Sequence, residues 1–380
     1  MYQPNLLDSF FLGGFECSTQ RRCNGRRLDL VAATQHDRFA ASDYLSLSRH
    51  GIRTVRDGVR WHLIETAPGH YDWSSLLPML RAARDSRTQV IWDLCHYGWP
   101  DDIDIWRPEF VERFARFAAA VARLMCDEGV EAPLFCPVNE MSYWAWAGGT
   151  TARFNPCARG RGDELKFQLV RASIAAIDGI RKVCPRARFV QIDPVIHIVS
   201  RSRRQRDRDN VERVRLAQYH AWDLLTGIDH PGLGGRPEYL DIVGVNYYSD
   251  NQWYANRETI TLKDPNYRPF HKILIETYRR YGRPILIAET GAEGNMRVPW
   301  LRYVSEQVGE ALRRDIPVEG ICLYPVTDYP GWNNNRHCRT GLLGLADEQG
   351  NRPLYEPLAK EVAYQRRRLE ALCRPLQWLT

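Results

Sequence analysis

Short apolar runs alternate with longer amphipathic stretches from one end of the chain to the other. Repeated alternation of this kind is typical of βα units built around a parallel sheet. Eight runs have the length and composition of buried strands, namely residues 10–15, 54–60, 89–95, 134–139, 188–192, 241–246, 284–289 and 320–326. Eight strands with intervening helices predict a closed (β/α)8 TIM barrel of the α/β class.

Three stretches between these runs have the periodicity of amphipathic helices. Residues 108–128 begin with proline in the first turn and place Phe110, Phe114 and Phe117 on one face. Residues 164–183 and 300–313 follow the same pattern. Because no low-complexity linker or internal repeat divides the sequence, we expect a single barrel domain over residues 1–380.

Charge and hydropathy narrow the class of protein. The net charge of +6 comes mainly from arginine, and the densest basic run, residues 201–215, is interleaved with acidic residues and holds no aromatic side chain for base stacking. This run indicates a solvated loop leading into a helix and not a nucleic-acid partner. No stretch approaches the ~20 apolar residues of a membrane span, and the first fifteen residues lack the basic start of a signal peptide.

The ten cysteines stand at positions 17, 23, 95, 126, 136, 157, 184, 322, 338 and 373. They form no C-x-x-C pair and no regular framework, which favours reduced thiols in a cytoplasmic protein over a disulfide scaffold or a zinc site. The histidines fall in no ligand spacing such as H-E-x-x-H. We therefore expect neither a metal nor another cofactor.

Polar and aromatic side chains gather where the predicted strands end. In a (β/α)8 barrel the active site lies at these strand ends and in the loops that follow them. The side chains placed there are Arg56, His96, Tyr97, Asn139, Glu140, Asn246, Tyr248, Glu289, Tyr324, Asp328 and Trp332. Two of them, Glu140 and Glu289, follow apolar runs in which a charge has no structural reason to stand unless it faces a polar cavity.

This pair of glutamates suits the hydrolysis of a glycosidic bond. Cleavage with retention needs one carboxylic acid to protonate the leaving oxygen and one carboxylate, ~5–5.5 Å away, to attack the anomeric carbon. Glu140 and Glu289 at the ends of the fourth and seventh strands can face each other across the barrel. Arg56 is the expected partner of Glu289, because a guanidinium favours the charged carboxylate, although Arg56 could instead form an ion pair with Asp57 or another acid.

The motifs around both glutamates resemble those of the family 1 glycoside hydrolases, the β-glucosidase-like enzymes, from about residue 11 to residue 342. CPVNEM resembles the family's T-x-N-E-P, and IAETG resembles I-T-E-N-G. The resemblance implies that Glu140 is the acid/base and Glu289 the nucleophile. VRDGVRW is similar to Y-R-F-S-I-S-W and places Arg56 at the family's arginine.

Further motifs imply residues that bind the sugar. DLCHYGWP resembles T-L-x-H-W-D-x-P, so His96 matches a sugar-contacting histidine and Tyr97 stands at a tryptophan position. FLGGFECSTQ is similar to the family's F-L-W-G…Q start, which implies that Gln20 binds sugar hydroxyls. In DIVGVNYYSD, Asn246 and Tyr248 match residues beside the sugar and the nucleophile.

The segment 324–342, YPVTDYPGWNNNRHCRTGL, has the spacing of the family's W-S-L-L-D-N-F-E-W-x-x-G-Y-x-x-R-F-G-L and keeps Asp328, Trp332 and Arg339. It departs at two positions. Tyr324 stands where the family has the tryptophan under the sugar, and Gly331 where the family has the glutamate that clamps the distal hydroxyls. Loss of that glutamate removes charge-assisted hydrogen bonds worth ~1.5–3 kcal/mol each, so we expect a sugar other than simple glucose.

Three alternatives remain open at this point. Arg336, His337 and Arg339 could accommodate an anionic sugar such as a uronic acid or a phosphorylated glycoside. The same catalytic pair could transfer the sugar to an acceptor other than water. The barrel could also be a catalytically silent carbohydrate-binding protein. In each case the partner is a carbohydrate, and the sequence does not determine the oligomeric state.

Overall fold

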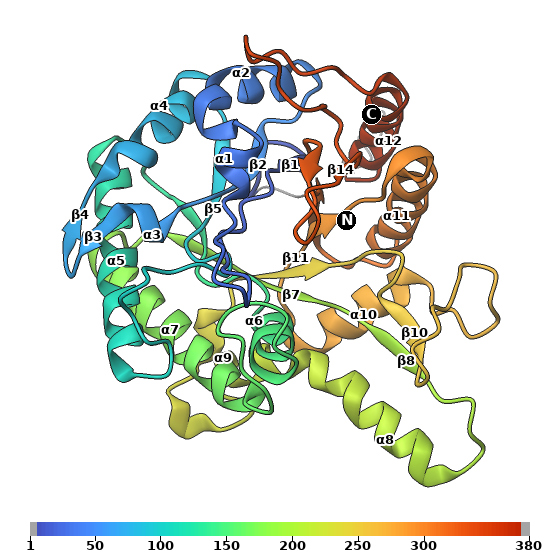
Figure 1. Cartoon of the computed structure of the whole chain (residues 1–380). Coiled ribbons are helices and arrows are strands. Elements are labelled where there is room, and N and C mark those ends of the chain that lie inside the picture. The colour runs from blue at the N-terminus through green and yellow to red at the C-terminus, as the bar shows by residue number, and fades with distance from the viewer. Residues whose placement is uncertain (1–5, 374–380) are drawn as a thin grey trace, which may run out of the picture.

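Eight parallel strands close into a barrel at the centre of the computed structural model, which describes residues 6–373 (Figure 1). Their order around the barrel is β1-β12-β11-β9-β7-β6-β5-β2. The strands are β1 (Phe11–Gly14), β2 (Thr54–Gly58), β5 (Gln89–Asp93), β6 (Leu134–Cys136), β7 (Arg188–Pro194), β9 (Ile242–Asn246), β11 (Ile285–Thr290) and β12 (Val318–Leu323). All eight predicted strands and the (β/α)8 TIM-barrel fold are confirmed.

Each strand is followed by a helix that packs on the outside of the barrel (Figure 1). These helices are α2 (His36–Arg49), α4 (Leu77–Asp85), α5 (Pro108–Asp127), α7 (Gly162–Val183), α9 (His220–Thr226), α10 (Phe270–Tyr281), α11 (Arg297–Leu312) and α12 (Glu356–Cys373). The predicted helices over 108–128, 164–183 and 300–313 are confirmed as α5, α7 and α11. Each carries its apolar face toward the strands, as the periodicity requires.

Shorter elements decorate the loops. The helices are α1 (Leu30–Ala33), α3 (Trp61–Ile64), α6 (Met141–Trp144), which continues as a π-helical turn over Ala145–Thr150, and α8 (Gln205–Leu216); 3-10 turns cover Trp73–Ser75, Ala217–Tyr219, Pro231–Leu233, Pro237–Tyr239 and Gly294–Met296. The strand pairs are β3 (Glu65–Ala67) with β4 (His70–Tyr71), β8 (His197–Val199) with β10 (Gln252–Tyr254), and β13 (Tyr329–Pro330) with β14 (His337–Cys338). No helix within residues 6–373 is long and apolar enough to cross a membrane.

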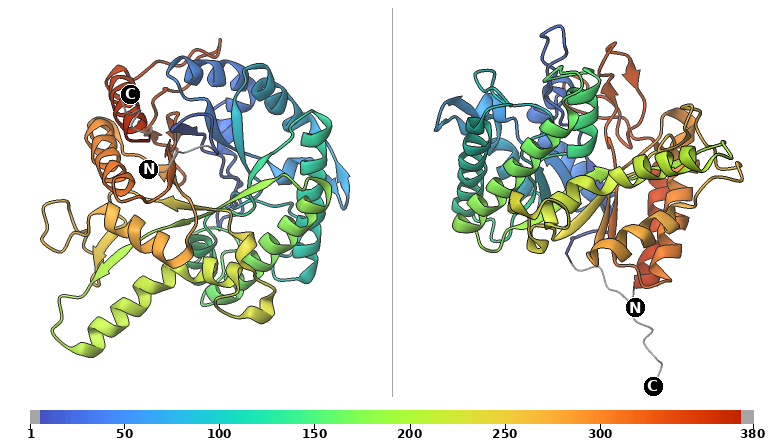
Figure 2. Two further views of the ribbon diagram at one scale, coloured as in Figure 1. Left: turned by 180° about the vertical axis from the view of Figure 1, so that it is seen from behind. Right: turned by 90° about the horizontal axis from the view of Figure 1, so that it is seen from below.

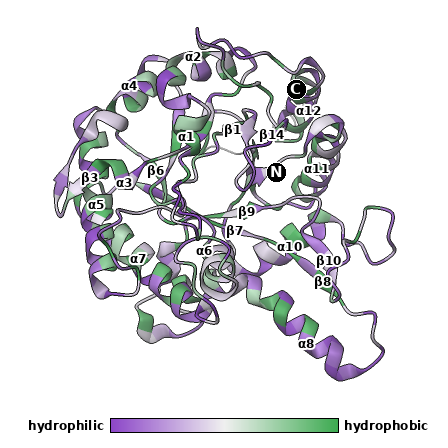
Figure 3. Cartoon of the chain, viewed as in Figure 1, coloured by the Kyte–Doolittle hydropathy of each residue, from purple (hydrophilic) through white to green (hydrophobic). Residues whose placement is uncertain are grey.

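The basic run over 201–215 forms a loop and then α8, as predicted. The helix projects from the barrel, and its far end is hydrophilic (Figures 1 and 3). Several of its arginines pair with nearby acidic groups, for example Arg215 with Glu212 and Glu276. The basic charge of α8 is therefore largely compensated within the chain.

The fourth strand is shorter than predicted and ends at Cys136 instead of Asn139. Pro137 follows at once, and proline has no N–H to donate to a strand ladder. The chain then turns so that Glu140 adopts the left-handed conformation, with φ 46° and ψ 58°, immediately before α6. This turn sets the direction of the Glu140 side chain at the end of the barrel.

The inside of the barrel is filled by apolar side chains that alternate with outward-facing ones along each strand. They are Leu12, Ile91, Leu134, Cys136, Val190, Ile192, Ile242, Leu286, Ala288, Cys322 and Tyr324. Tyr324 closes this layer at the end where the strands finish. A Cβ atom on Gly14 would lie 2.3 Å from Cδ2 of Tyr324, so only glycine leaves room for the ring there.

A buried ionic network fastens α2 to the second strand. His36 Nδ1 lies 2.7 Å from Asp43 Oδ2, and His36 Nε2 lies 2.7 Å from Asp57 Oδ2. The Tyr44 hydroxyl also donates to Asp57, over 2.6 Å. Arg352, in the segment before α12, donates to Asp43 over 2.6 Å and so joins the end of the chain to its beginning.

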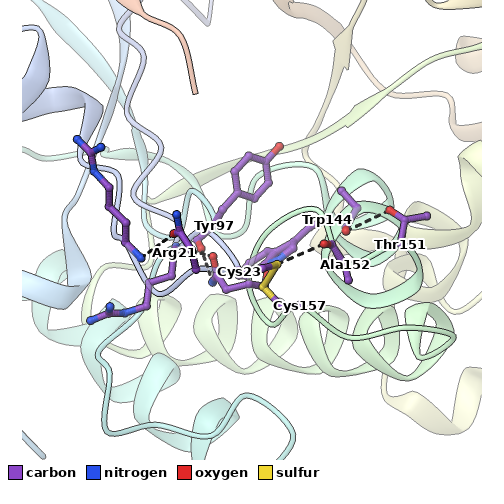
Figure 4. The surroundings of a disulfide bond; sticks show 11 residues. Arg21, Cys23, Tyr97, Trp144, Thr151, Ala152 and Cys157 are labelled. Atoms are coloured by element: carbon purple, nitrogen blue, oxygen red, sulfur yellow. Dashed lines mark hydrogen bonds between the residues drawn. A yellow bond between two sulfur atoms is a disulfide. The ribbon is translucent and has the colours of Figure 1, made fainter. Parts of the chain in front are cut away.

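The expectation that all the cysteines are reduced is wrong for two of them. Cys23, in the loop after β1, forms a disulfide with Cys157, in the loop before α7, while the other eight are free (Figure 4). The two cysteines are 134 residues apart in sequence, and only closure of the barrel brings their loops together. Local spacing therefore gives no sign of the pair.

Candidate active site

The residues predicted from strand ends lie at one end of the barrel. The loop after β1 and the β13–β14 hairpin project from this same end (Figure 2). Hydrogen bonds connect residues from β2, β5, β9 and β11 and from the loop after β6 into one network there. Parallel strands that end together thus bring distant parts of the sequence into one polar site.

Glu289 stands near the end of β11, and both of its carboxylate oxygens accept hydrogen bonds. Arg56 Nη1 donates to Oε1 over 2.6 Å, and the Tyr248 hydroxyl donates to Oε2 over 2.9 Å. Glu289 is 5 % exposed, and Arg56 is fully buried. The ion pair with a guanidinium inside the protein favours the charged form of this carboxylate.

Arg56 is the centre of the polar network. Besides Glu289 it binds Asp93 through two hydrogen bonds of 2.9 and 2.5 Å, and its Nη2 donates to Asn139 Oδ1 over 2.6 Å. Burial opposes its charge, but the negative charges of Asp93 and Glu289 outweigh burial and raise the pKa of Arg56 well above its ordinary value. Of the alternative partners expected for Arg56, Asp57 is not found, since it faces His36 on the other side of β2, whereas another acid, Asp93, binds Arg56 together with Glu289.

Glu140 has neutral partners instead of a cation. Asn246 Nδ2 donates to Oε1 over 2.8 Å, and the Tyr97 hydroxyl donates to Oε2. Burial and the negative charge of Glu289 raise the pKa of Glu140 to about 8, against smaller opposing effects of the two hydrogen bonds. The two glutamates therefore stand in unlike surroundings, one beside a guanidinium and one beside neutral donors.

His96 and Asn139 join the two glutamates through shared partners. His96 Nδ1 lies 2.8 Å from Asp93 Oδ2, and His96 Nε2 lies 3.0 Å from Asn139 Nδ2. Asn139 Nδ2 also donates to the Tyr97 hydroxyl over 3.1 Å. The ring orientation of His96 is thus fixed from both sides.

Two further predicted residues, Tyr324 and Trp332, frame this network, and a third, Gln20, is buried in the loop after β1. Tyr324 stacks parallel to His96 at 6.3 Å between ring centres and lies 5.1 Å from the guanidinium of Arg56. Trp332, beyond β13, packs edge-on against Tyr97 at 5.9 Å. Gln20 is 1 % exposed, and its Oε1 has no hydrogen-bond partner among residues 6–373. An unpartnered buried acceptor of this kind is available to a hydroxyl group of a ligand.

Tyr97 lies beside the two loops that the disulfide joins (Figure 4). Asn155, two residues before Cys157, donates through Nδ2 to the carbonyl oxygen of Tyr97 over 2.9 Å and accepts from the backbone N–H of Arg21 over 2.7 Å. The disulfide therefore holds together two loops. One contains Asn155, which binds Tyr97, and the other contains Arg21 and its neighbour Gln20.

Sequence reasoning missed two acidic residues in this site. Asp93 ends β5 and pairs with Arg56, and the strand-end position that identified the glutamates would also have found it. Burial would raise the pKa of Asp93, but the charge of Arg56 outweighs burial and holds it below the usual range. Glu16, in the loop after β1, is 4 % exposed and accepts hydrogen bonds from Ser18.

Cys17, Asp93 and His96 bring one potential metal ligand each to within 4.8 Å of one another. Burial and the charge of Asp93 raise the pKa of the Cys17 thiol well above its ordinary value, so the thiol stays protonated. Asp93 is already neutralised by Arg56. In the structure these three side chains are joined by hydrogen bonds and take part in the network around Arg56.

The closed barrel with its polar end is the architecture of a large class of enzymes, and comparison with solved structures narrows the class. A β-glucosidase from Thermotoga maritima in complex with castanospermine matches with a TM-score of 0.77 and 14% identity over 95% of this chain and 98% of that one. A hyperthermophilic β-glucosidase mutant matches with a TM-score of 0.74 and 17% identity over 93% and 99%. No family model and no curated protein matches the sequence.

The fold is therefore that of the family 1 β-glucosidases, one of which, also from Thermotoga maritima, matches with a TM-score of 0.75 and 14% identity over 94% of this chain and 98% of that one. The resemblance read from the motifs is confirmed in the fold, and the chain is a divergent example of it.

Proposed function

We propose that the protein is a retaining β-glycosidase in which Glu140 is the acid/base and Glu289 the nucleophile. The observation that carries the proposal is the unlike surroundings of two buried carboxylates in one network. Arg56 and Tyr248 stabilise the charge on Glu289, whereas Glu140 has only neutral donors and a pKa of about 8. Two carboxyl groups whose surroundings separate their protonation states are what acid and nucleophile require.

The reaction divides into two displacements. Glu289 attacks the anomeric carbon while Glu140 gives its proton to the leaving oxygen, which yields a glycosyl ester on Glu289 and a free alcohol. Glu140, now ionised, takes a proton from water, and the resulting hydroxide attacks the same carbon and releases Glu289. Asn246 and Tyr97 hold the two oxygens of Glu140 in place for both proton transfers.

The remaining predicted residues are proposed to bind the sugar. His96, Asn139 and Gln20 present polar atoms at the site, and Tyr324 and Trp332 present aromatic rings, which suit the apolar faces of a pyranose. A neutral sugar fits better than an anionic one. Arg336 is paired with Glu293 and His337 with Asp328, which leaves Arg339 as the one of these three basic residues without an ion pair among the described residues.

The test is hydrolysis of nitrophenyl β-glycosides, namely glucoside, galactoside, glucuronide and 6-phosphoglucoside. Glu289→Gln is expected to abolish turnover of every substrate that the wild type cleaves. Glu140→Gln is expected to lower kcat/KM about 10²–10⁴-fold with a poor leaving group and far less with dinitrophenol, which leaves without a proton. Glu293→Gln, a matched change at the exposed pair with Arg336, should leave the activity on the neutral glucoside and galactoside unchanged.

Two further measurements decide the mechanism. Mass spectrometry after inactivation with a 2-fluoro glycoside should find the label on Glu289, and a label elsewhere contradicts the assignment. NMR of the first-formed sugar should show the β anomer, whereas the α anomer would mean inversion. A wild type as inactive as Glu289→Gln on every glycoside would favour the carbohydrate-binding alternative, and products that change with added acceptor would favour transglycosylation.

A further inference from the structure

Glu16 belongs to the loop that leaves the first strand of the barrel. Along β1, Leu12 and Gly14 face the interior, and alternation of side chains extends this side to Glu16. Glu16 therefore follows the row that ends on Gly14, against which Tyr324 packs. Its side chain is 4 % exposed at the end of the barrel that holds both catalytic glutamates.

The carboxylate of Glu16 has no cationic partner among the described residues. Its Oε1 accepts from the backbone N–H of Ser18 over 3.1 Å and from the Ser18 hydroxyl over 2.5 Å. It lies near enough to Glu289 and His96 for their charges to act on it. Burial, above all, and Glu289 raise its pKa, while His96 and the bonds from Ser18 lower it. A buried carboxyl group without a cation destabilises a fold, so a role in ligand binding would account for it.

Glu16 stands in the loop after β1, which projects from the same end of the barrel as the β13–β14 hairpin that departs from the family pattern (Figure 2). Its charge acts on the phenol groups of Tyr324 and Tyr329, and Tyr329 stands two residues before Gly331. Gly331 occupies the position at which the family has a sugar-clamping glutamate. The loop after β1 thus brings a carboxylate to the end of the barrel at which Gly331 stands in place of the family's glutamate.

A second observation points to a polar ligand in the same site. The Oε1 atom of Gln20, four residues after Glu16, is buried and unpartnered within residues 6–373, and so is Oδ1 of Asn246. Both atoms are acceptors and call for hydroxyl donors. Glu16, whose carboxylate accepts only from Ser18 among the described residues, is a third acceptor, and a polyhydroxylated ligand would supply hydroxyl donors to all three.

We propose that the carboxylate of Glu16 accepts hydrogen bonds from hydroxyl groups of the bound sugar and replaces the clamp that is absent at Gly331. The inference rests on the proposed glycosidase function and adds the class of substrate to it. The sugar is neutral and carries free hydroxyls on the side that faces Glu16. A uronic acid or a phosphorylated sugar with its charge on that side would meet a second negative charge and be rejected.

The experiment compares wild type, Glu16→Gln and the control Glu293→Gln on the best nitrophenyl glycoside and on its 3-, 4- and 6-deoxy analogues. Glu16→Gln keeps the shape of the side chain and an oxygen for Ser18. We expect it to lower kcat/KM on the parent glycoside about 10- to 100-fold, as the loss of a charge-assisted hydrogen bond does. On the deoxy analogue that lacks the contacted hydroxyl, Glu16→Gln and wild type should be equally active.

The outcomes separate a binding role from a structural one. Equal losses on the parent and on all three deoxy analogues would mean that Glu16 only shapes its loop, and would overturn the inference. So would a change of less than twofold on every substrate. Ser18→Ala adds a check, because it loosens the loop but leaves the carboxylate, and should retain the wild-type pattern of deoxy selectivity.

A failure of the proposed function has a different signature. If wild type cleaves no glycoside, that function is wrong. Glu16 is then tested by calorimetric titration of the parent sugar itself, in which unchanged affinity of Glu16→Gln overturns the inference. If wild type cleaves glycosides and only the deoxy pattern fails, the Glu16 inference alone is wrong.

Discussion

Glu140 and Glu289 are both buried, yet only Glu289 touches a guanidinium group. The raised pKa of Glu140 has a direct consequence for pH dependence. Glu140 must be protonated to act as an acid, and its pKa is about 8. The kcat/KM of the free enzyme should therefore be level up to about pH 7, be halved at about pH 8 and approach a tenfold fall per pH unit above about pH 9.

The hydrogen bond from Tyr97 tests this assignment at the level of one atom. The bond stabilises ionised Glu140 and so lowers its pKa. Tyr97→Phe removes the donor, the pKa of Glu140 rises, and the alkaline limb of the kcat/KM profile moves to higher pH. Profiles between pH 6 and pH 10.5 measure the shift. Tyr254→Phe, whose hydroxyl binds Asp264 away from the site, should keep the wild-type limb. A limb that moves to lower pH contradicts the assignment.

Among the elements, α2 depends on a buried charge whose effect varies with pH. Burial would lower the pKa of His36, but the charges of Asp57 and Asp43 outweigh it and raise the pKa to about 9. Since the unfolded value is ~6.5, protonated His36 stabilises the fold in full below pH ~6.5, and this contribution is lost as the pH rises through 9. The contribution of protonated His36 to the free energy of unfolding is about 3 kcal/mol.

We therefore expect His36→Gln to lower the free energy of unfolding by about 3 kcal/mol at pH 6.5 and by less at pH 9.5. Urea unfolding at pH 6.5, 8 and 9.5 measures both values. His50→Gln, at the end of the same helix and partly exposed, should show no such dependence. A difference between wild type and His36→Gln that stays constant with pH would contradict a charged His36.

The disulfide between Cys23 and Cys157 leads to a prediction about the number of reactive thiols and the stability of the chain. Without reductant, the denatured chain should expose eight reactive thiols, and after reduction ten. Cys157→Ser should lower the free energy of unfolding by about 2–4 kcal/mol, because the unfolded chain gains conformational entropy when the cross-link is absent. It should also weaken substrate binding, since Asn155 no longer holds Tyr97 firmly. Cys126→Ser, a free cysteine, is the control, and ten reactive thiols without reductant would contradict the bridge.

At the scale of the whole molecule, the strands and the main helices were predictable because their signals are local. Apolar runs identify buried strands, periodicity of side chains identifies the helices, and strand ends identify the candidate site. Part of the network was also within reach. Successive side chains of a strand point to opposite faces, so Arg56 and Asp57 could not have formed a pair. Asp57 instead faces His36, and Arg56 faces the barrel interior.

What could not be predicted depends on contacts between distant segments. The bridge between Cys23 and Cys157, and the reach of Arg352 to Asp43, follow from closure of the barrel, which no local pattern encodes. The role of Glu16 was hidden for a related reason. A carboxylate in a loop gives no signal by itself, and it becomes informative only when its burial and its nearness to Glu289 are known.

A ligand that binds at the site should raise the free energy of unfolding of the entire barrel. An iminosugar carries a cation that can pair with the nucleophile, and it binds the folded chain alone. At 100 times its Kd it should raise the free energy of unfolding by about 2.7 kcal/mol and so raise Tm. Glu289→Gln should lose most of this shift, because the neutral amide no longer attracts the cation.

Iminosugars of different configuration extend the same measurement to the sugar specificity of the site. Glucose-, galactose- and mannose-shaped iminosugars differ only in the orientation of single hydroxyls, so the largest Tm shift identifies the sugar that the site prefers. The glucose-shaped compound should not give the largest shift, because the carboxylate proposed to bind the sugar hydroxyls comes from Glu16 and not from the family's position at Gly331. Equal Tm shifts in wild type and Glu289→Gln would mean that the compounds bind elsewhere, and would contradict a site centred on Glu289.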